Sequence, residues 1–237
     1  MARQGKKKRF KKIFRKSIRV GAMVAVFLIL ATVVQVAVLR YINPPFTLTV
    51  VWETVVHLIK SRPYKRPVFI WRPMEAISPH LRRAVLAAED QRFPDHLGFD
   101  LIEIQKAAKD ILRGHRFRGA STISMQASRT VFLLPVRNIF RKALEAYYTV
   151  LIELMWSKRR ILEVYLNTVD WGPQVMGAEA ACLAYFKKHA ADISPRQAAL
   201  LAAILPKPHR YSPTKPGPYV RTRAKRILAD MKRMPNL

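Results

Sequence analysis

The chain has 237 residues, of which 50% are hydrophobic, and its net charge is +28. A single cysteine, Cys182, excludes an intramolecular disulfide, and the sequence contains no Cys/His cluster with metal-ligand spacing, no glycine-rich phosphate loop and no internal repeat. We expect Cys182 to be a small buried residue, because it lies in the apolar run AEAACLAYF.

The N-terminal region reads as a cytoplasmic tail followed by a membrane anchor. Residues 1–19 hold ten Lys or Arg and no acidic residue. Residues 20–39 carry no ionisable side chain, and a helix of that length spans the roughly 30 Å hydrocarbon core of a bilayer. The following LRYINPPF has no small-residue cleavage site, so we expect a retained transmembrane helix over residues 20–40. The cations before it predict a cytoplasmic amino end, with everything after Arg40 outside.

The remainder of the chain is also basic, with 33 Lys or Arg against 15 acidic residues. A strongly basic chain ordinarily suggests a nucleic-acid partner. On an exported domain tied to a membrane, however, the same charge favours anionic lipid head groups and anionic lipid-linked substrates. We therefore predict membrane lipids as a partner and no nucleic acid.

Residues 41–76 read as a juxtamembrane linker interrupted by prolines. Its segment TLTVVWETVVHLI fits either an interfacial helix or a strand, and VFIW fits a short strand. Residues 77–237 are enough for one domain with a substantial core. The domain should be mostly α, with its site in loops between helices and without strand-like alternation. Its apolar pattern predicts helices over residues 77–88, 100–112, 121–132, 136–156, 159–166, 175–186, 195–205 and 219–234.

Two serines mark predicted helix starts. Ser78 and Ser194 each precede a proline, and Gln197 adds the third member of a capping box after Ser194.

The first candidate site is the stretch AAEDQRFPDHLGFD, residues 87–100. Glu89 and Asp90 directly follow the apolar stripe of the predicted helix 77–88, where carboxylates face the negative end of the helix dipole. Such a local conflict is typical of functional sites. Phe93 and His96 follow in the loop. The alternative is a solvated turn in which Asp90 forms a salt bridge with Arg92.

A second candidate is RGASTISMQASRT, residues 118–130. Ser121 and Thr122 place hydroxyl groups at a helix entrance, where free backbone N–H groups favour an anion. The same hydroxyls would also serve as ordinary helix caps.

A third candidate is RNIFRKALEAYYTVLIE, residues 137–153. Arg137, Arg141 and Glu145 recur at intervals of four, so they share one face of a helix, and Lys142 lies beside them. The alternative is a solvated salt-bridge ladder.

In order and spacing, these stretches resemble the membrane-bound peptidoglycan glycosyltransferases of glycosyltransferase family 51, especially the monofunctional members. EDQRFPDHLGFD is similar to the first family motif, GASTISMQ to the second, RKALE to the third and SKRRILEVYLN to the fourth. The resemblance implies a mostly α, lysozyme-like domain on the outer face of the bacterial cytoplasmic membrane. Its implied reaction polymerises lipid II into β-1,4 glycan strands with inversion and releases undecaprenyl pyrophosphate. Its implied partners are lipid II, the growing lipid-linked glycan chain and other cell-wall synthesis proteins.

The resemblance also assigns roles to the matching residues. Glu89 becomes the general base that takes the proton from the acceptor 4-hydroxyl. Glu145 becomes the second catalytic glutamate, which orients cations at the pyrophosphate or helps to hold a divalent ion such as Mg²⁺, with no tightly bound cofactor. Cations would stabilise the charge that develops on the leaving pyrophosphate. The implied substrate-binding residues are Asp90, Phe93, His96, Ser121, Thr122, Gln126, Arg129, Arg137, Arg141 and Lys142.

The second motif departs from the family pattern. Met125 replaces the first of two paired glutamines, while Arg129 and Thr130 stand where Lys-Asn is usual. Arginine keeps the charge of lysine but binds phosphate through a planar fork. Two other classes of function remain open: a lysozyme-like hydrolase, which would also use two carboxylates, and a non-catalytic membrane scaffold, which needs only the charge and the anchor.

Overall fold

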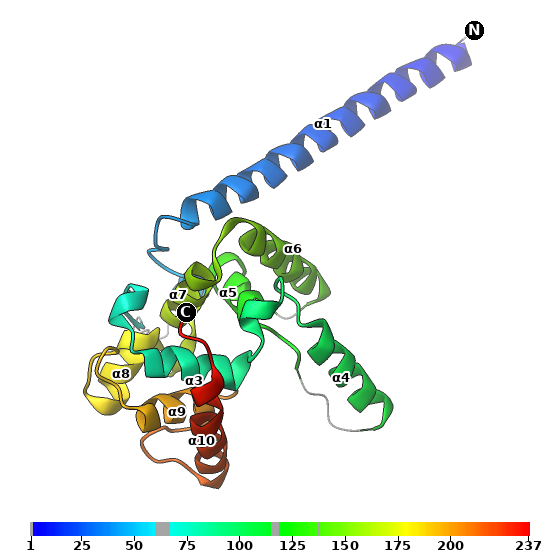
Figure 1. The fold of residues 1–237 in the computed structure, drawn as a ribbon. Helices are drawn as coiled ribbons and strands as arrows, with labels where there is room; N and C mark the ends of the chain where they lie inside the picture. Colours follow the sequence, from blue (N-terminus) through cyan, green and yellow to red (C-terminus); the bar gives the residue numbers. More distant parts are fainter. Residues whose placement is uncertain (1, 60–66, 115–118, 137) are drawn as a thin grey trace. The chain divides into compact units, whose positions relative to one another are not determined.

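The computed structural model describes residues 2–59, 67–114, 119–136 and 138–237 (Figure 1). The chain divides into two compact units, Met1–Ile42 and Asn43–Leu237. The expected mostly helical fold with one N-terminal apolar helix is confirmed.

The first unit consists chiefly of the long helix α1, Ala2–Leu39 (Figure 1). Its segment Phe14–Leu39 is 26 residues long, and among the described residues it is the one helix long and apolar enough to cross a membrane. Large apolar side chains such as Met23 and Phe27 are about 70% exposed. Apolar surface exposed along the helix in this way is what a lipid-facing helix requires.

The second unit is built mainly from helices. The segment left open between helix and strand is the helix α2 (Leu48–Ile59). The other α-helices of this unit are α3 (Pro79–Glu89), α4 (Leu101–Leu112), α5 (Ile123–Phe132), α6 (Ile139–Met155), α7 (Lys158–Thr168), α8 (Ala178–Phe186), α9 (Pro195–Ile204) and α10 (Pro218–Asp230). Short 3-10 turns lie at Met74–Ala76, Phe93–Asp95 and Met231–Arg233.

A small sheet corrects the expectation that strands are absent from the domain. Strand β1 (Val68–Phe69), within the predicted VFIW segment, pairs in parallel with β3 (Val175–Met176). Strand β2 (Asp170–Gly172) pairs antiparallel with β3, so the order is β1-β3-β2. The helix predicted over residues 175–186 therefore begins only at Ala178. Strands of two or three residues are too short for an alternating apolar pattern to be recognised.

Two groups of helices supply the packing that positions the site. Helix α3 packs against α9 and α10, and α5 packs against α6 and α7. Leu81, Leu86 and Leu201 are fully buried in the first group, and Ile123 and Ile152 in the second. Each group therefore holds the end of one site-bearing helix: the C-terminus of α3 and the N-terminus of α5.

The predicted helix starts are confirmed. The Ser78 hydroxyl accepts a hydrogen bond from the His80 N–H at 3.3 Å, and Ser194 and Gln197 form the complete capping box. Cys182 is buried as expected, and burial raises the pKa of its thiol to about 12. A thiol with so high a pKa stays protonated and serves packing.

A buried polar network holds the chain after β1 against α7 and α8. The side-chain amide of Asn167 accepts from the Arg72 N–H at 2.8 Å and donates to the Arg72 carbonyl at 2.9 Å. Glu179 accepts from Arg72 at 2.8 Å, from His189 at 2.7 Å and from the Ala190 N–H at 2.8 Å. Burial acts to raise the pKa of Glu179, but these donors outweigh it and lower the pKa.

Candidate active site

Glu89 is the last residue of α3 and lines a cavity of about 740 Å³. Its side chain is 15% exposed. Its Oε2 accepts from Nε2 of Gln126 at 3.1 Å, and its Oε1 lies 3.2 Å from Nη2 of Arg223. Burial raises the pKa of Glu89, although both of these partners oppose the shift. A carboxylate with a raised pKa is a stronger base, so this group is suited to taking a proton.

Gln126 is oriented from its other side by Tyr165. The Tyr165 hydroxyl donates to Oε1 of Gln126 at 3.5 Å, which leaves the amide N–H groups to face Glu89. Tyr165 is 1% exposed, and burial together with the negative charge of Glu89 raises its pKa well above the ordinary value. The hydroxyl therefore stays protonated and remains a donor. Arg129, one turn beyond Gln126 on α5, acts electrostatically to lower the pKa of both Glu89 and Tyr165.

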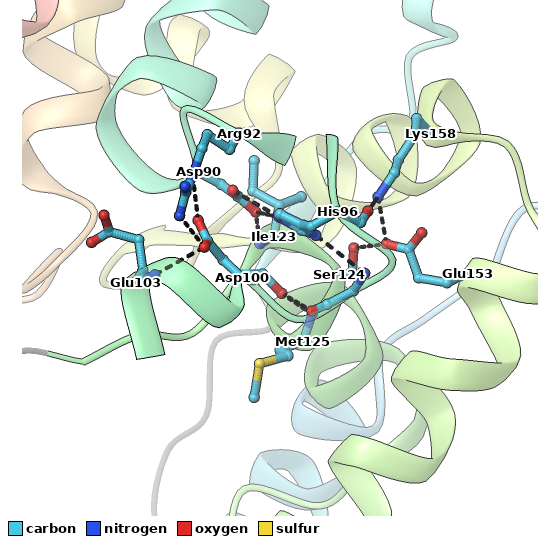
Figure 2. Close-up of polar contacts among 12 residues, drawn as sticks. Asp90, Arg92, His96, Asp100, Glu103, Ile123, Ser124, Met125, Glu153 and Lys158 are labelled. Atoms are coloured by element: carbon cyan, nitrogen blue, oxygen red, sulfur yellow. Dashed lines mark hydrogen bonds and ion pairs between the residues drawn. The ribbon is translucent and has the colours of Figure 1, made fainter. Parts of the chain in front are cut away.

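Asp90 joins the end of α3 to the start of α5 (Figure 2). It is 7% exposed, and its carboxylate accepts from the Ile123 N–H at 2.9 Å. Nε2 of His96 lies 3.0 and 3.1 Å from its two oxygens. Nδ1 of His96 accepts from the Gly98 N–H at 3.1 Å, so the ring proton must lie on Nε2 and is donated to Asp90.

The alternative interpretation of this loop, a solvated turn with an Asp90–Arg92 salt bridge, is wrong. Arg92 instead pairs with Asp100, with 3.0 Å between Nε and Oδ2. Asp100 also caps α4 by accepting from the Glu103 N–H at 2.9 Å (Figure 2). Burial acts to raise the pKa of Asp100, but the Arg92 and Glu103 donors outweigh it and lower the pKa.

Phe93 and His96 pack against each other within the loop that follows α3. Phe93 is fully buried, and its ring meets the His96 ring edge to face with 6.2 Å between centroids. Nζ of Lys158 lies 4.6 Å from the centre of the Phe93 ring. The same ammonium donates to the His96 carbonyl at 2.5 Å and to Glu153 at 2.8 Å. Neither Phe93 nor His96 is among the residues that line the Glu89 cavity.

Ser121 and Thr122 do line that cavity, as a hydroxyl-bearing entrance to α5. The Thr122 hydroxyl accepts from the Met125 N–H at 3.2 Å and donates to the Gly98 carbonyl at 2.6 Å. Gly98 has φ +86°, and a Cβ there would lie 2.6 Å from Cγ2 of Thr149. Only glycine fits this close approach, so the loop at Gly98 packs directly against α6.

Glu145 forms a separate cluster on α6. It is fully buried, with Oε2 2.5 Å from Nη1 of Arg141 and Oε1 paired with Lys142. The alternative of a solvated ladder is therefore wrong for Glu145, whereas Arg137 lies outside the described residues. Glu145 does not line the Glu89 cavity.

The surroundings of Glu145 do not fit a divalent cation. Both of its oxygens are held by cationic side chains, and in the described part of the chain no three His, Cys, Asp or Glu residues gather as a metal site. Mg²⁺ prefers oxygen ligands and would be repelled by Arg141 and Lys142.

Comparison with known proteins gives the family. The model of the transglycosylase family matches residues 57–232. The chain belongs to the transglycosylase family. This transglycosylase is 47% identical, over 201 residues, to the biosynthetic peptidoglycan transglycosylase of Pseudomonas aeruginosa, with 85% of this chain and 86% of the relative covered.

Two further relatives carry the same name. The protein from Shewanella oneidensis is 44% identical over 207 residues, which cover 87% of this chain and 88% of the relative. The protein from Caulobacter vibrioides is 45% identical over 207 residues, which cover 86% and 87%.

Sequence reasoning missed two residues that contact the predicted site of this transglycosylase. Arg223 lies in VRTRAKR, where nothing in the spacing distinguishes it from its basic neighbours. Tyr165 lies in the predicted helix over residues 159–166 and is buried, but its hydroxyl also reaches Gln126. Of the residues that depart from the family pattern, Met125 is 6% exposed, and the Thr130 hydroxyl donates to the Gln126 carbonyl within its own helix at 2.8 Å.

Proposed function

We propose that this transglycosylase is a peptidoglycan glycosyltransferase of cell-wall synthesis, which polymerises lipid II into β-1,4 glycan strands. The observation that carries the proposal is Glu89. In a chain of this family, it presents a carboxylate of raised pKa to a cavity of about 740 Å³ that also holds hydroxyl groups and cations. Such a cavity has room for sugar units beside a positioned base.

In the proposed reaction, Glu89 accepts the proton of the acceptor 4-hydroxyl as that oxygen attacks the anomeric carbon of the growing chain. The new C1–O4 bond forms while the bond from C1 to the pyrophosphate oxygen breaks, so the α-linked donor is inverted to a β-1,4 linkage. Gln126 and Arg223 fix the carboxylate through one contact on each oxygen. A general base of this kind contributes about 10²- to 10⁴-fold to the rate.

We assign the cations on α5 and α6 to the leaving undecaprenyl pyrophosphate. Arg129, Arg141 and Lys142 would stabilise the charge that develops on the phosphate oxygens, and Arg137 is proposed to act with them. Glu145 then acts by positioning, because it holds Arg141 and Lys142 through one ion pair on each oxygen.

A hydrolase is the weaker alternative. A lysozyme-like hydrolase needs a second available carboxylate near the first. Three other described acidic residues line the cavity with Glu89, and each has a partner. Asp90 is bound by His96 and the Ile123 N–H, Asp100 by Arg92, and Glu103 by Lys106 at 2.9 Å.

We propose the topology that the sequence predicts. Residues 1–19 form the cytoplasmic tail, residues 20–40 cross the inner membrane once, residues 41–76 link the anchor, and residues 77–237 form the glycosyltransferase domain on the outer side. Lipid II and the growing glycan chain would then be reached from the membrane surface. A reporter active only outside the cytoplasm, fused after Leu237, should give a signal, and a signal from a cytoplasm-only reporter would contradict this orientation.

The function is tested by polymerisation of labelled lipid II with the full-length protein in detergent. The native chain should form long strands that lysozyme digests, and Glu89→Gln should lower the rate at least about 10²-fold because it removes the base. Glu75→Gln is a matched control, since Glu75 is exposed and pairs with Arg159 away from the cavity. Equal rates for the native chain and Glu89→Gln would contradict the role of Glu89. No polymer from the folded native chain would favour the scaffold.

A further inference from the structure

A second cavity, of about 420 Å³, adjoins the one that holds Glu89. It is formed between the end of α3 and the face of α10 that carries Thr222, Arg226 and Asp230. Both cavities are also lined by Ala87, Ala88, Gln91, Tyr219 and Arg223. The second cavity, called the α10 groove below, therefore continues directly from the neighbourhood of the proposed base.

The charges in the α10 groove favour an anion. Nη2 of Arg223 donates to the Ala88 carbonyl at 3.0 Å and to Oε1 of Glu89 at 3.2 Å. Among the described residues that line the groove, Asp230 is the acidic one, and it is paired with Arg233. Arg226 is exposed and forms no ion pair with an acidic side chain in the described part of the chain. An Arg fork that is open to solvent and unpaired can bind a carboxylate with two parallel hydrogen bonds.

The groove lining also offers groups for a peptide backbone. Gln91 and Thr222 add an amide and a hydroxyl to the same lining, where Nε2 of Gln91 donates to the Ala87 carbonyl at 3.1 Å. Tyr219 adds an aromatic ring that is 50% exposed. A segment bound here would thus meet hydrogen-bonding groups, the aromatic ring of Tyr219 and the exposed guanidinium of Arg226. A short peptide with carboxylate groups matches this combination of groups.

We propose that the α10 groove binds the carboxylate-bearing peptide stem of lipid II, with Arg226 as a carboxylate ligand. The inference rests on the proposed function. In the donor, the stem is attached to the sugar whose anomeric carbon reacts. In the acceptor, it is attached to the neighbour of the sugar whose 4-hydroxyl attacks. In both cases the stem begins within one sugar ring of the reacting atoms. The α10 groove is near enough to receive it, because the groove shares lining residues with the Glu89 cavity. The groove thereby makes the enzyme sensitive to the peptide part of its substrate.

The opposite face of α10 supplies the control. There Arg221 and Lys225 line a different cavity, of about 600 Å³, which shares no residue with the Glu89 cavity. Lys225 is exposed and adjacent in sequence to Arg226. Lys225→Gln therefore removes one positive charge from the same helix without touching the α10 groove.

The test compares two substrates with the full-length protein in detergent: lipid II with its complete peptide stem and lipid II cut back to the first stem residue. The native chain should show a higher kcat/KM for the complete stem. Arg226→Gln should lower kcat/KM for that substrate by about two- to fivefold, through KM, as loss of one exposed ion pair does. With the shortened substrate kcat/KM should not change. Arg226→Lys should keep part of the preference, and Lys225→Gln should keep all of it.

The outcomes separate the two proposals. Polymer formation with the same substrate preference in the native chain and in Arg226→Gln overturns the stem site alone. An equal loss on both substrates also overturns it, because Arg226 would then act on a part that both share. Absence of polymer from the folded native chain with either substrate overturns the proposed function and the stem site with it.

Discussion

Glu89 takes its properties from residues on three other helices. Gln126 comes from α5, Arg223 from α10, and Tyr165 from α7 orients Gln126. Burial raises the pKa of Glu89, and the Gln126 and Arg223 contacts limit that rise. The two effects leave a carboxylate that binds a proton more strongly than an ordinary glutamate and is still held in one orientation.

The pH dependence of the reaction should reflect the pKa of Glu89, which burial raises and the Gln126 and Arg223 contacts lower. Because the base must be deprotonated, kcat/KM should fall as the pH drops through the raised pKa of Glu89. Arg223→Gln removes a positive charge that lowers this pKa, so the pKa should rise further and the acid limb should move to higher pH. The measurement is kcat/KM against pH for the native chain, Arg223→Gln and the control Lys225→Gln. An acid limb that stays in place or moves to lower pH would contradict the electrostatic role of Arg223.

At the scale of elements, Asp90 decides how α3 and α5 meet. Its carboxylate receives the Ile123 N–H of α5 and the His96 ring of the intervening loop. The Thr122 hydroxyl adds a second link by donating to the Gly98 carbonyl. Glu89 and Gln126, on the two helices joined in this way, are thereby held within hydrogen-bond distance.

Loss of the Asp90 carboxylate should therefore destabilise the fold as well as the site. Asp90→Ala leaves the Ile123 N–H and the His96 ring N–H without a partner in a buried region, so the free energy of unfolding should fall by about 2–4 kcal/mol. The control is Asp95→Ala, at an exposed position of the same loop, which should change it by less than about 0.5 kcal/mol. Urea denaturation of both variants measures the difference, and equal midpoints would rule out the linking role of Asp90.

The ion pairs of Glu145 should not contribute equally to stability. Arg141 is 17% exposed and Lys142 is 48% exposed, so Arg141 is the better desolvated partner of the buried carboxylate. Arg141→Ala should lower the free energy of unfolding by roughly 1–3 kcal/mol, less than for a completely broken buried pair because Lys142 remains. Lys142→Ala should cost less than about 1 kcal/mol. Denaturation curves that gave Lys142→Ala the larger loss would contradict this ranking.

At the scale of the whole molecule, the unit Asn43–Leu237 combines a basic charge with uncovered apolar side chains. Ile139 and Phe140 at the start of α6 are 80% and 77% exposed. The other strongly exposed apolar residues on and around α4 and α6 include Leu97, Leu101, Ile102, Leu112 and Leu154. Exposed apolar groups in this number are typical of a surface that meets a membrane or a partner.

We expect this unit to bind lipid vesicles without its anchor. A chain of residues 43–237 should sediment with anionic vesicles at low salt through charge, and part of the binding should persist with neutral vesicles at high salt through apolar contact. Replacing Ile139 and Phe140 together by serine should reduce the binding that persists with neutral vesicles at high salt. Binding to anionic vesicles at low salt should remain. Salt-resistant binding that is equal in both chains would show that these two residues do not face lipid.

The local sequence predicted most of the helices because their determinants are local. The 3.6-residue apolar period and the caps at Ser78 and Ser194 act within one or two turns, and the structure confirms both caps. Strand β1 lies within the predicted VFIW segment, but β2 and β3 escaped prediction. Val175 and Met176 of β3 are specified by their pairing with residues 68–69, more than a hundred positions earlier. Pairing over such a distance leaves no periodic signal in so short a segment.

By itself, the sequence determined the N-terminal apolar helix, the helical class and the motifs that contain Glu89 and Gln126. Tertiary structure alone decided which groups meet the proposed base. Arg223 reaches Glu89 across 134 positions of sequence because α10 packs against α3. Asp90 binds the His96 ring and the Ile123 N–H, and not the nearby Arg92, because its carboxylate is buried between α3 and α5. A pKa depends on burial and on the charges that packing brings close, and neither can be predicted from the spacing of residues along the chain.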